Sequence, residues 1–234
     1  MATDVNRTLL ESGELEVTGR LVDASNATLY AKVTLNDREK ICIYKPIAGE
    51  RPLWDFPDGT LADREYAAFL ISDFLDLNLV PLTILRDGPY GLGMVQEWIE
   101  IDETIDLASY FSQDLPELRR MAFFDAIINN TDRKIGHLLP NQNGELFGCD
   151  HGVTFHEQDK LRTVLWQWAG EPLSPGEIQS LKSLLAGLRD NLDLSPHITE
   201  KEIEALGMRV QRLLVESVMP MPSPDWPPIP WPAF

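Results

Sequence analysis

The sequence is poor in cysteine and in long apolar runs. Cys42 and Cys149 are the only cysteines in 234 residues, which favours reduced, buried thiols over a disulfide framework. No apolar run is long enough to span a bilayer, and the first residues, "MATDVNRTLL", do not have the layout of a signal peptide. These absences predict a cytoplasmic protein.

Basic side chains are also scarce. Lysine and arginine number 20 against 37 acidic residues, giving a net charge of −17. Nucleic acids and anionic lipid surfaces are bound through positive patches, so neither partner is expected, and no stable membrane association is expected. A nucleotide is not excluded, because a magnesium ion and one or two lysines can offset its phosphate charge locally.

What is present is an ordinary globular composition, 44% apolar and 24% charged, in a chain long enough for one large domain or two small lobes. The first hundred residues predict strands. Residues 14–35 alternate around a polar turn, "KICIYK" predicts a strand ending at Lys45, and residues 79–101 predict two strands joined by a glycine-bearing turn. Between them, Thr60 can cap a helix beginning at Leu61.

The second half predicts helices. A helix is expected at 115–129, with an inner face made of Leu118, Met121, Ala122 and Ile128. A hairpin follows, with its turn at Asn141 to Gly144. Two capping boxes then predict helices at about 175–190 and 199–216.

The tail, residues 219–234, holds seven of the seventeen prolines together with Trp226, Trp231 and Phe234. Proline favours extended geometry over helix. We expect the aromatic side chains to pin the tail to the body of the protein. The alternative is a peptide that docks in the aromatic groove of a partner.

Acidic residues mark a candidate site in "NNTDRKIGHLLP", residues 129–140. Asp132 follows a predicted helix, and Asp150 follows a strand eighteen residues later, so the hairpin between them would bring both carboxylates close together. Such a pair suits magnesium and a phosphate-bearing ligand. Lys45 could reach the same phosphates, and Glu65 on the next helix could hold that lysine. These parts, in this order, are those of a kinase.

The motifs resemble the phosphoinositide 3- and 4-kinase superfamily, nearest to the type II phosphatidylinositol 4-kinases, and more closely a small bacterial family of phosphatidylinositol-kinase-like proteins. The resemblance covers residues 15–175. It is carried by five motifs in the family's order: "IYKP", "REYAAFLISDFLDLNLVPLT", "VQEWIE", "DAIINNTDRKIGHLL" and "CDHGVTF".

The resemblance implies a two-lobed α+β kinase-like fold that uses ATP and Mg²⁺, with residues 1–103 as a β-rich N-lobe, 104–218 as a helical C-lobe and 219–234 as a tail. It implies that Lys45 contacts the ATP phosphates and pairs with Glu65. Ser25 and Asn26 would cover the phosphates, and the backbone of Gln96 and Trp98 would bind adenine. The remaining roles go to the acidic residues: Asp132 would orient the acceptor hydroxyl and Asp150 would bind the metal.

The chain departs from the family's pattern at His137, where the lipid kinases have an asparagine that binds metal. Imidazole is a poor ligand for magnesium and a better one for manganese or zinc. The phosphate-covering turn is not rich in glycine, and the cysteine-rich membrane-anchoring insert is absent. The expected acceptor is therefore a hydroxyl of a cytoplasmic protein or small molecule. The alternatives are a nucleotide-binding pseudokinase that acts as an interaction module, and an enzyme that transfers AMP.

Structural roles remain open for the same residues. Lys45 could extend its charge from a strand end to solvent, Asp132 could cap a turn, and Asp125 is expected to hydrogen-bond the catalytic loop from the buried side of its helix. His137, His151 and His156 could form a zinc site with an aspartate, although their spacing fits no familiar template. Core packing is the expected role of three further side chains: Cys149, Trp166 and Trp168.

Overall fold

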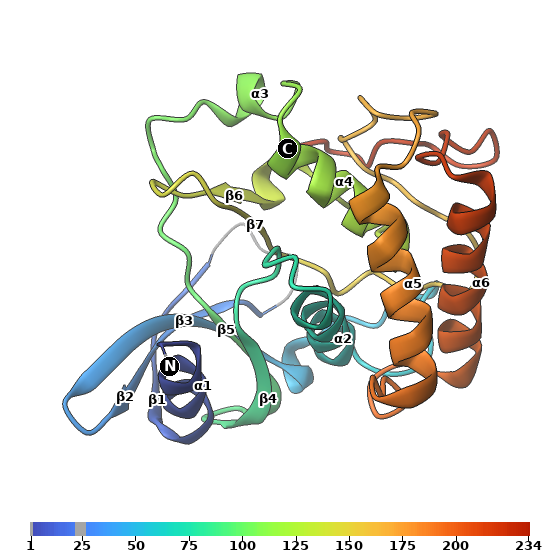
Figure 1. Cartoon of the computed structure of the whole chain (residues 1–234). Helices are drawn as coiled ribbons and strands as arrows, with labels where there is room; N and C mark the ends of the chain where they lie inside the picture. Colours follow the sequence, from blue (N-terminus) through green and yellow to red (C-terminus); the bar gives the residue numbers. More distant parts are fainter. Residues whose placement is uncertain (1, 22–26) are drawn as a thin grey trace.

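The computed structural model describes residues 2–21 and 27–234, so the predicted phosphate-covering residues Ser25 and Asn26 lie outside the described residues. An antiparallel sheet in the N-terminal part is followed by helices in the C-terminal part (Figure 1). The strands are β1 Glu14–Arg20, β2 Leu29–Leu35, β3 Arg38–Pro46, β4 Thr83–Gly88, β5 Gly91–Glu97, β6 Leu138–Pro140 and β7 Leu146–Gly148.

Helices lie against the sheet and are the main regular elements of the C-terminal part (Figure 1). The α-helices are α1 Ala2–Ser12, α2 Leu61–Phe74, α3 Leu107–Tyr110, α4 Pro116–Ile128, α5 Pro175–Asp190 and α6 Glu200–Glu216. Two short 3₁₀ turns complete the described elements: η1 Ile47–Gly49 and η2 Ile135–His137.

The main sheet has the order β1-β2-β3-β5-β4, and all of its strand pairs are antiparallel. The register places Arg86 on the same face as the fully buried Tyr44. Arg86 donates to the carbonyls of Leu10 and Gly13, at 2.7 and 2.8 Å, so this face carries α1. Because neighbouring side chains of a strand point to opposite faces, Lys45 points to the other face, toward α2.

The helix predicted to begin at Leu61 is confirmed. The hydroxyl of Thr60 accepts a hydrogen bond from the Asp63 amide at 3.0 Å, which caps the first turn. Its buried face carries charged side chains, since Arg64 and Glu65 are each only 2% exposed. A neighbouring side of the helix carries three half-buried apolar side chains: Tyr66, Leu70 and Phe74.

The other predicted elements are confirmed, including the inner face of α4, the β6–β7 hairpin, and the capping boxes of α5 and α6. Two helices are additional to those predicted from the sequence. In α1, the fully buried apolar side chains are Leu9 and Leu10, and α3 is a single turn capped by Asp106. No helix in the described part of the chain is long and apolar enough to cross a membrane.

The tail packs along the C-terminal part of the molecule, as predicted, although backbone groups hold it more than its aromatic rings do. The Pro228 carbonyl accepts from the Thr163 amide at 3.0 Å and from the Trp166 indole at 2.9 Å. The Trp226 ring lies 4.6 Å from the Lys160 ammonium. The expectation that all three aromatics are pinned is wrong, because Trp231 and Phe234 are 89% and 65% exposed.

Candidate active site

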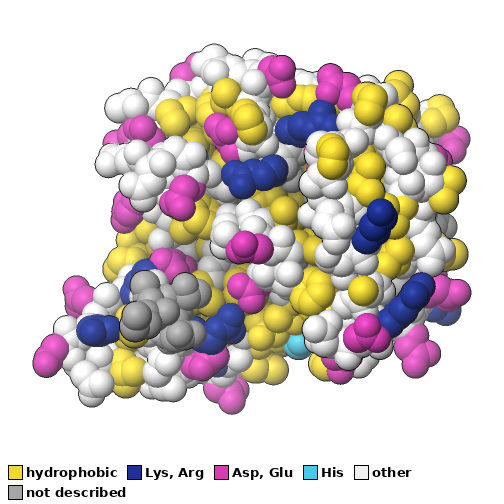
Figure 2. All heavy atoms as spheres, in the orientation of Figure 1, with side chains coloured by type: hydrophobic (Ala, Val, Ile, Leu, Met, Phe, Trp, Pro, Cys, Tyr) yellow, Lys and Arg dark blue, Asp and Glu magenta, His cyan; other side chains and the backbone are white. Residues whose placement is uncertain are grey.

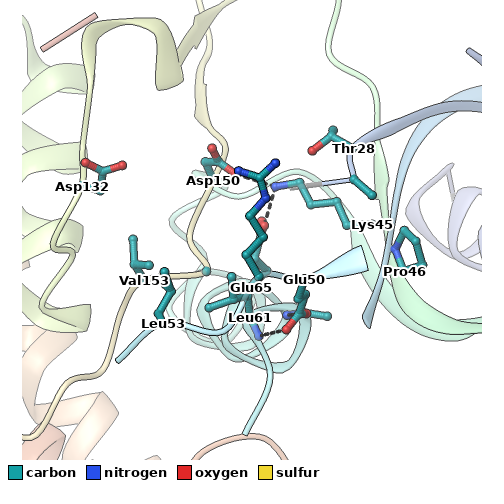
Figure 3. A pocket seen from close by; sticks show the side chains of 14 residues that line it. Thr28, Lys45, Pro46, Glu50, Leu53, Leu61, Glu65, Asp132, Asp150 and Val153 are labelled. Atoms are coloured by element: carbon teal, nitrogen blue, oxygen red, sulfur yellow. Dashed lines mark hydrogen bonds and ion pairs between the residues drawn. The ribbon is translucent and has the colours of Figure 1, made fainter. Parts of the chain in front are cut away.

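A cavity of about 380 Å³ lies where the sheet, α2 and two loops of the C-terminal part meet. Lys45 reaches it from β3 and Glu65 from α2, while Asp132 and Asp150 come from the loops (Figure 3). Four of the predicted site residues are therefore brought together. Since they lie far apart in the chain, the cavity depends on the tertiary fold.

Lys45 bridges two carboxylates. Its ammonium lies 2.5 Å from Glu65 Oε1 and 2.5 Å from Asp150 Oδ1. Burial alone would lower the lysine pKa, but the negative charges of Asp150 and Glu65 raise it above its usual value, so the ammonium stays charged. A lysine that merely extends to solvent would have neither partner. This alternative for Lys45 is therefore wrong.

The two carboxylates differ in environment. Glu65 is almost fully buried, and burial raises the pKa of its carboxyl, although Lys45 opposes the effect. Asp150 keeps 55% of its side chain exposed, and Lys45 holds the pKa of its carboxyl well below its usual range. Asp150 is thus an ionised carboxylate that faces the cavity. It is available to a cation, whereas Glu65 is in place to orient Lys45.

Asp132 lines the same cavity from the loop between α4 and η2 (Figure 3). Its amide donates to Asn130 Oδ1 at 3.0 Å, and its carboxylate lies 3.4 Å from the Lys134 ammonium. Burial raises the pKa of the carboxyl, with Lys134 opposing the effect. The carboxylate caps no backbone amide in the described structure and keeps 34% of its side chain exposed. The sequence alternative of a turn-capping aspartate is therefore not supported.

A fully buried ion pair supports both acidic loops. The Arg133 guanidinium, on the loop after α4, binds both oxygens of Asp125 on α4, at 2.9 to 3.2 Å. The same guanidinium donates to the Cys149 carbonyl at 3.0 Å and lies 2.6 Å from His151 Nε2. The predicted structural role of Asp125 is confirmed. Arg133 was not predicted, although it directly follows Asp132 in the chain.

His137 lies beside Asp150, with Nε2 3.5 Å from Asp150 Oδ2. Burial lowers the pKa of the imidazole to about 4, so the ring is neutral near pH 7. Its Nδ1 accepts a long bond from the Lys134 amide at 3.5 Å, which favours the tautomer with its hydrogen on Nε2. His137 ends the η2 turn and precedes β6 rather than beginning that strand.

The three histidines do not form a zinc site. His151 is fully buried against Arg133, and His156 lies 3.4 Å from Asp55. Within residues 2–21 and 27–234, no group of three or more His, Cys, Asp or Glu side chains could hold a metal ion. A divalent cation at Asp150 would therefore need oxygen ligands from a bound phosphate as well.

Some of the backbone predicted to bind adenine is already paired within the protein. Gln96 and Trp98 do not line the cavity. The Gln96 strand is paired on both sides and its side-chain amide donates to Thr83 Oγ1 at 2.9 Å. The Trp98 amide already donates to the Ile41 carbonyl at 3.2 Å. A hydrogen bond from that amide to adenine would require this contact to break.

Two solved structures share the fold. The crystal structure of the Golgi casein kinase has a TM-score of 0.57 and 14% identity, covering 92% of this chain and 74% of its own. The crystal structure of the Helicobacter pylori proinflammatory kinase CtkA has a TM-score of 0.50 and 12% identity, covering 90% of this chain and 94% of its own. At these identities the likeness shows the fold alone, and the predicted α+β kinase-like fold is confirmed.

No protein-family model matches the chain. Protein Rv2133c of Mycobacterium tuberculosis is 44% identical over 268 aligned residues, which span 99% of this chain and 96% of that protein. Identity of this extent over nearly the whole of both sequences shows common descent. The chain therefore belongs to the family of protein Rv2133c, and it has the fold of the protein kinases.

Proposed function

We propose that the protein transfers the γ-phosphoryl group of ATP to a hydroxyl of a protein or small molecule, as a phosphoinositide-kinase-like enzyme. The observation that carries the proposal is the Lys45 ammonium held between Glu65 and Asp150, on the wall of the cavity that Asp132 also lines. Phosphoryl transfer needs positioning and charge neutralisation more than covalent catalysis. A fixed ammonium between two carboxylates, beside a third, meets these needs.

In the proposed reaction, the acceptor hydroxyl oxygen attacks the γ-phosphorus. A new oxygen–phosphorus bond forms, the bond from the γ-phosphorus to the β–γ bridging oxygen breaks, and ADP leaves with the bond's electrons. Asp132 orients the hydroxyl and takes its proton, which then passes to solvent. Lys45 contacts the α- and β-phosphates of ATP, and Glu65 keeps the ammonium in place.

A magnesium ion, or a manganese ion, fits the carboxylates of this site. Asp150 is ionised and half-exposed, and carboxylate oxygens are the ligands that magnesium prefers. Asp150 would hold the ion, and bound phosphate oxygens would supply further ligands. The ion would neutralise phosphate charge when bound. His137 would ligate only after losing the hydrogen on Nε2, and would then favour manganese over magnesium.

We also propose the division into lobes at 1–103 and 104–218, with the ATP site between them. Adenine would lie near the segment 96–98, provided that the bond from the Trp98 amide to Ile41 opens. Action in the cytoplasm is proposed on the grounds that Cys42 and Cys149 are both free thiols.

The test uses the protein with γ-labelled ATP and a lysate of the host cell, followed by mass identification of whatever acquires label. We expect labelled acceptor with the wild type and none with Asp132→Asn. If the wild type yields no labelled product and no ADP with magnesium or manganese, phosphoryl transfer is excluded. If label from α-labelled ATP enters the product, the enzyme transfers AMP instead.

A second candidate is a nucleotide-binding pseudokinase that works as an interaction module. The geometry of His137 favours it, since a neutral imidazole with its hydrogen toward Asp150 does not replace a second metal ligand. This candidate predicts ATP binding by calorimetry without turnover. Restored turnover in His137→Asn would identify the histidine as the reason.

A further inference from the structure

A second cation lines the cavity of the candidate active site. Among the residues that the structure describes, the positively charged side chains on the cavity wall are Lys45 and Arg51. Lys45 is proposed to contact the α- and β-phosphates of ATP. The sequence motifs give no role to Arg51, which comes shortly after β3 and is exposed. An exposed arginine on this wall is within reach of whatever the cavity binds.

The backbone next to Arg51 is fastened from two directions. The two carboxylate oxygens of the preceding residue, Glu50, accept hydrogen bonds from the first two amides of α2, at 2.9 Å each. One residue earlier, the Gly49 carbonyl accepts from the Ala27 amide at 3.3 Å, just before β2. Arg51 therefore extends from a segment that is held both to the helix α2 and to the edge of the sheet.

The four carboxylates on the cavity wall each have a donor other than this arginine. Glu65, Asp132 and Asp150 each lie beside a lysine ammonium. Glu50 is bound by two amides at the N-terminus of α2, where the helix dipole also stabilises a negative charge. None of the four depends on Arg51 for neutralisation. We therefore expect the fold to tolerate the loss of the Arg51 charge.

The charge balance of the cavity requires a second cation when ATP binds. A triphosphate stays negatively charged after a single divalent ion has bound to it, and phosphoryl transfer depends on neutralising that charge. The chain has a net charge of −17, and acidic side chains are spread over the face shown in Figure 2, so no positive field of the whole molecule offsets it. The Lys45 ammonium is already divided between two carboxylates. Arg51 supplies the second positive charge inside the cavity.

The path of this segment indicates which phosphate Arg51 reaches. Figure 3 shows Lys45 on one side of the cavity, Asp132 and Leu53 on the other, and Glu50 near the middle of the view. The chain from Glu50 to Leu53 thus leads toward the side where Asp132 lies. In the proposed reaction, the γ-phosphoryl group lies between the phosphates held by Lys45 and the hydroxyl oriented by Asp132. Arg51 belongs to the segment that spans this interval.

We propose that Arg51 binds the γ-phosphoryl group of ATP and stabilises the negative charge of that group in the transition state. The inference deepens the proposed phosphotransferase function and rests on it. A guanidinium donates in a fixed fork that matches two phosphate oxygens, whereas the Lys45 ammonium acts as a point charge. Arg51 neither gives nor takes a proton, so the balanced step given above is unchanged. Glu50 is a positioning residue, because it holds the backbone that carries the arginine.

The first arm of the test measures binding and does not depend on turnover. Calorimetry with magnesium present compares ADP with a non-hydrolysable ATP analogue that carries a γ-phosphoryl group. In Arg51→Met, the affinity for the analogue should fall about tenfold to a hundredfold, while the affinity for ADP stays unchanged. Lys45→Met should weaken both nucleotides. Arg51→Lys should retain part of the affinity for the analogue, because the charge remains and the fork is lost.

Arg38 provides the matched control, because it is an exposed arginine at the start of β3 that does not line the cavity. Arg38→Met removes the same charge from the chain and should leave both affinities unchanged. Equal effects of Arg38→Met and Arg51→Met overturn the proposal. Equal losses of ADP and analogue affinity in Arg51→Met overturn it as well, and so does the absence of any loss. Melting temperatures check that each variant is folded, and Arg51→Lys decides the question if Arg51→Met is not.

The second arm measures the transfer of label from γ-labelled ATP in a lysate of the host cell. Arg51→Met should lower the rate at saturating ATP as well as raise the KM for ATP, because the contact is stronger in the transition state. A lower rate with both nucleotide affinities unchanged would assign Arg51 to the acceptor and overturn the proposal.

The two arms together separate this proposal from the proposed function. If the wild type transfers label and Arg51→Met behaves like it, the γ-phosphoryl contact alone is wrong. If the wild type binds the analogue through Arg51 and transfers no label, the phosphotransferase function alone is wrong. If the wild type binds neither nucleotide, both are wrong.

Discussion

At the scale of single residues, the central feature is an ammonium between two carboxylates. Replacing Lys45 by methionine should weaken ATP binding by about 1.5–3 kcal/mol, because a charge-assisted phosphate contact is lost. The change also leaves Glu65 buried, 3% exposed, without its cation. We therefore expect Glu65 to take up a proton in this variant and the melting temperature to fall.

The matched control is the double variant, in which Lys45→Met is combined with Glu65→Gln. The amide carries no charge, so the double variant should recover melting temperature but not ATP affinity. Calorimetry with ATP and thermal denaturation separate the two effects. An unchanged affinity in Lys45→Met would remove Lys45 from the nucleotide site.

The burial of His137 predicts how the free energy of unfolding depends on pH. Burial lowers the pKa of its imidazole to about 4 in the folded protein, against the ordinary histidine value of 6.5. Between these values the unfolded chain binds more protons than the folded one, so the free energy of unfolding decreases as pH falls. Near pH 7 the neutral His137 contributes at most about 3 kcal/mol to the free energy of unfolding. This contribution is lost as the pH drops toward 4.

His137→Asn tests this by urea denaturation at several pH values between about 7 and 4. The variant should show a shallower fall in the free energy of unfolding than the wild type, because asparagine does not titrate. Groups that do not interact with His137 contribute equally to both proteins and cancel in the difference, whereas Asp150 and His151 sense the change as well. Equal slopes would show that His137 titrates alike in the folded and unfolded states.

At the scale of elements, α2 is fastened to the C-terminal part as well as to the sheet. The Arg64 guanidinium binds Glu202 of α6 at 2.5 Å, and donates to the Thr154 carbonyl at 3.2 Å, four residues after Asp150. One residue earlier, Asp63 lies 3.0 Å from His197 Nδ1. The helix that presents Glu65 to Lys45 is thus held to the C-terminal part by one buried and one half-buried ion pair.

Arg64→Met should destabilise the protein by about 3–5 kcal/mol, since it leaves the buried Glu202 without its partner. Glu202→Gln should cost less, because the amide can still accept from Arg64. Combining the two changes should cost clearly less than the sum of the single costs. Strict additivity in a denaturation cycle would mean that the ion pair does not hold α2.

The elements also show what local sequence can predict. Thr60 and the capping boxes mark helix starts, and alternating strands such as "KICIYK" mark the sheet, because both signals lie within a few residues. Lys45, Glu65, Asp132 and Asp150 were found through short motifs of the same kind. Helix α1 was not predicted, although its apolar side chains gather on one face, where Leu9 and Leu10 are buried.

The contacts that assemble the site were not predictable in this way. Arg64 meets Glu202 across 138 positions, and Arg133 reaches Cys149 and His151 through the fold. No local periodicity encodes such pairs. The Trp98 amide was expected to bind adenine, but it donates to the Ile41 carbonyl. This contact depends on the path of the chain just after β5, which sequence spacing does not specify.

At the scale of the whole molecule, the tail joins regions that are distant in the chain. Besides Pro228 and Ala233, its Trp226 ring lies over the Lys160 ammonium, which in turn contacts Asp55 at 2.6 Å in the loop before α2. The tail therefore links the loop preceding the Glu65 helix with the segment after α4, at Ile135. It should matter both for stability and for the geometry of the site.

Deleting residues 224–234 removes the acceptors for the Thr163 amide, the Trp166 indole and the Ile135 amide. At about 1 kcal/mol for each bond, and about 2–4 °C per kcal/mol for a chain of this size, the melting temperature should fall by roughly 6–12 °C. Deleting only 231–234 frees the Ile135 amide but keeps both bonds to Pro228. This shorter deletion should therefore cost less stability while still loosening the catalytic loop, which hydrogen exchange at Ile135 would detect. If both deletions leave the melting temperature and exchange unchanged, the tail does not stabilise the body.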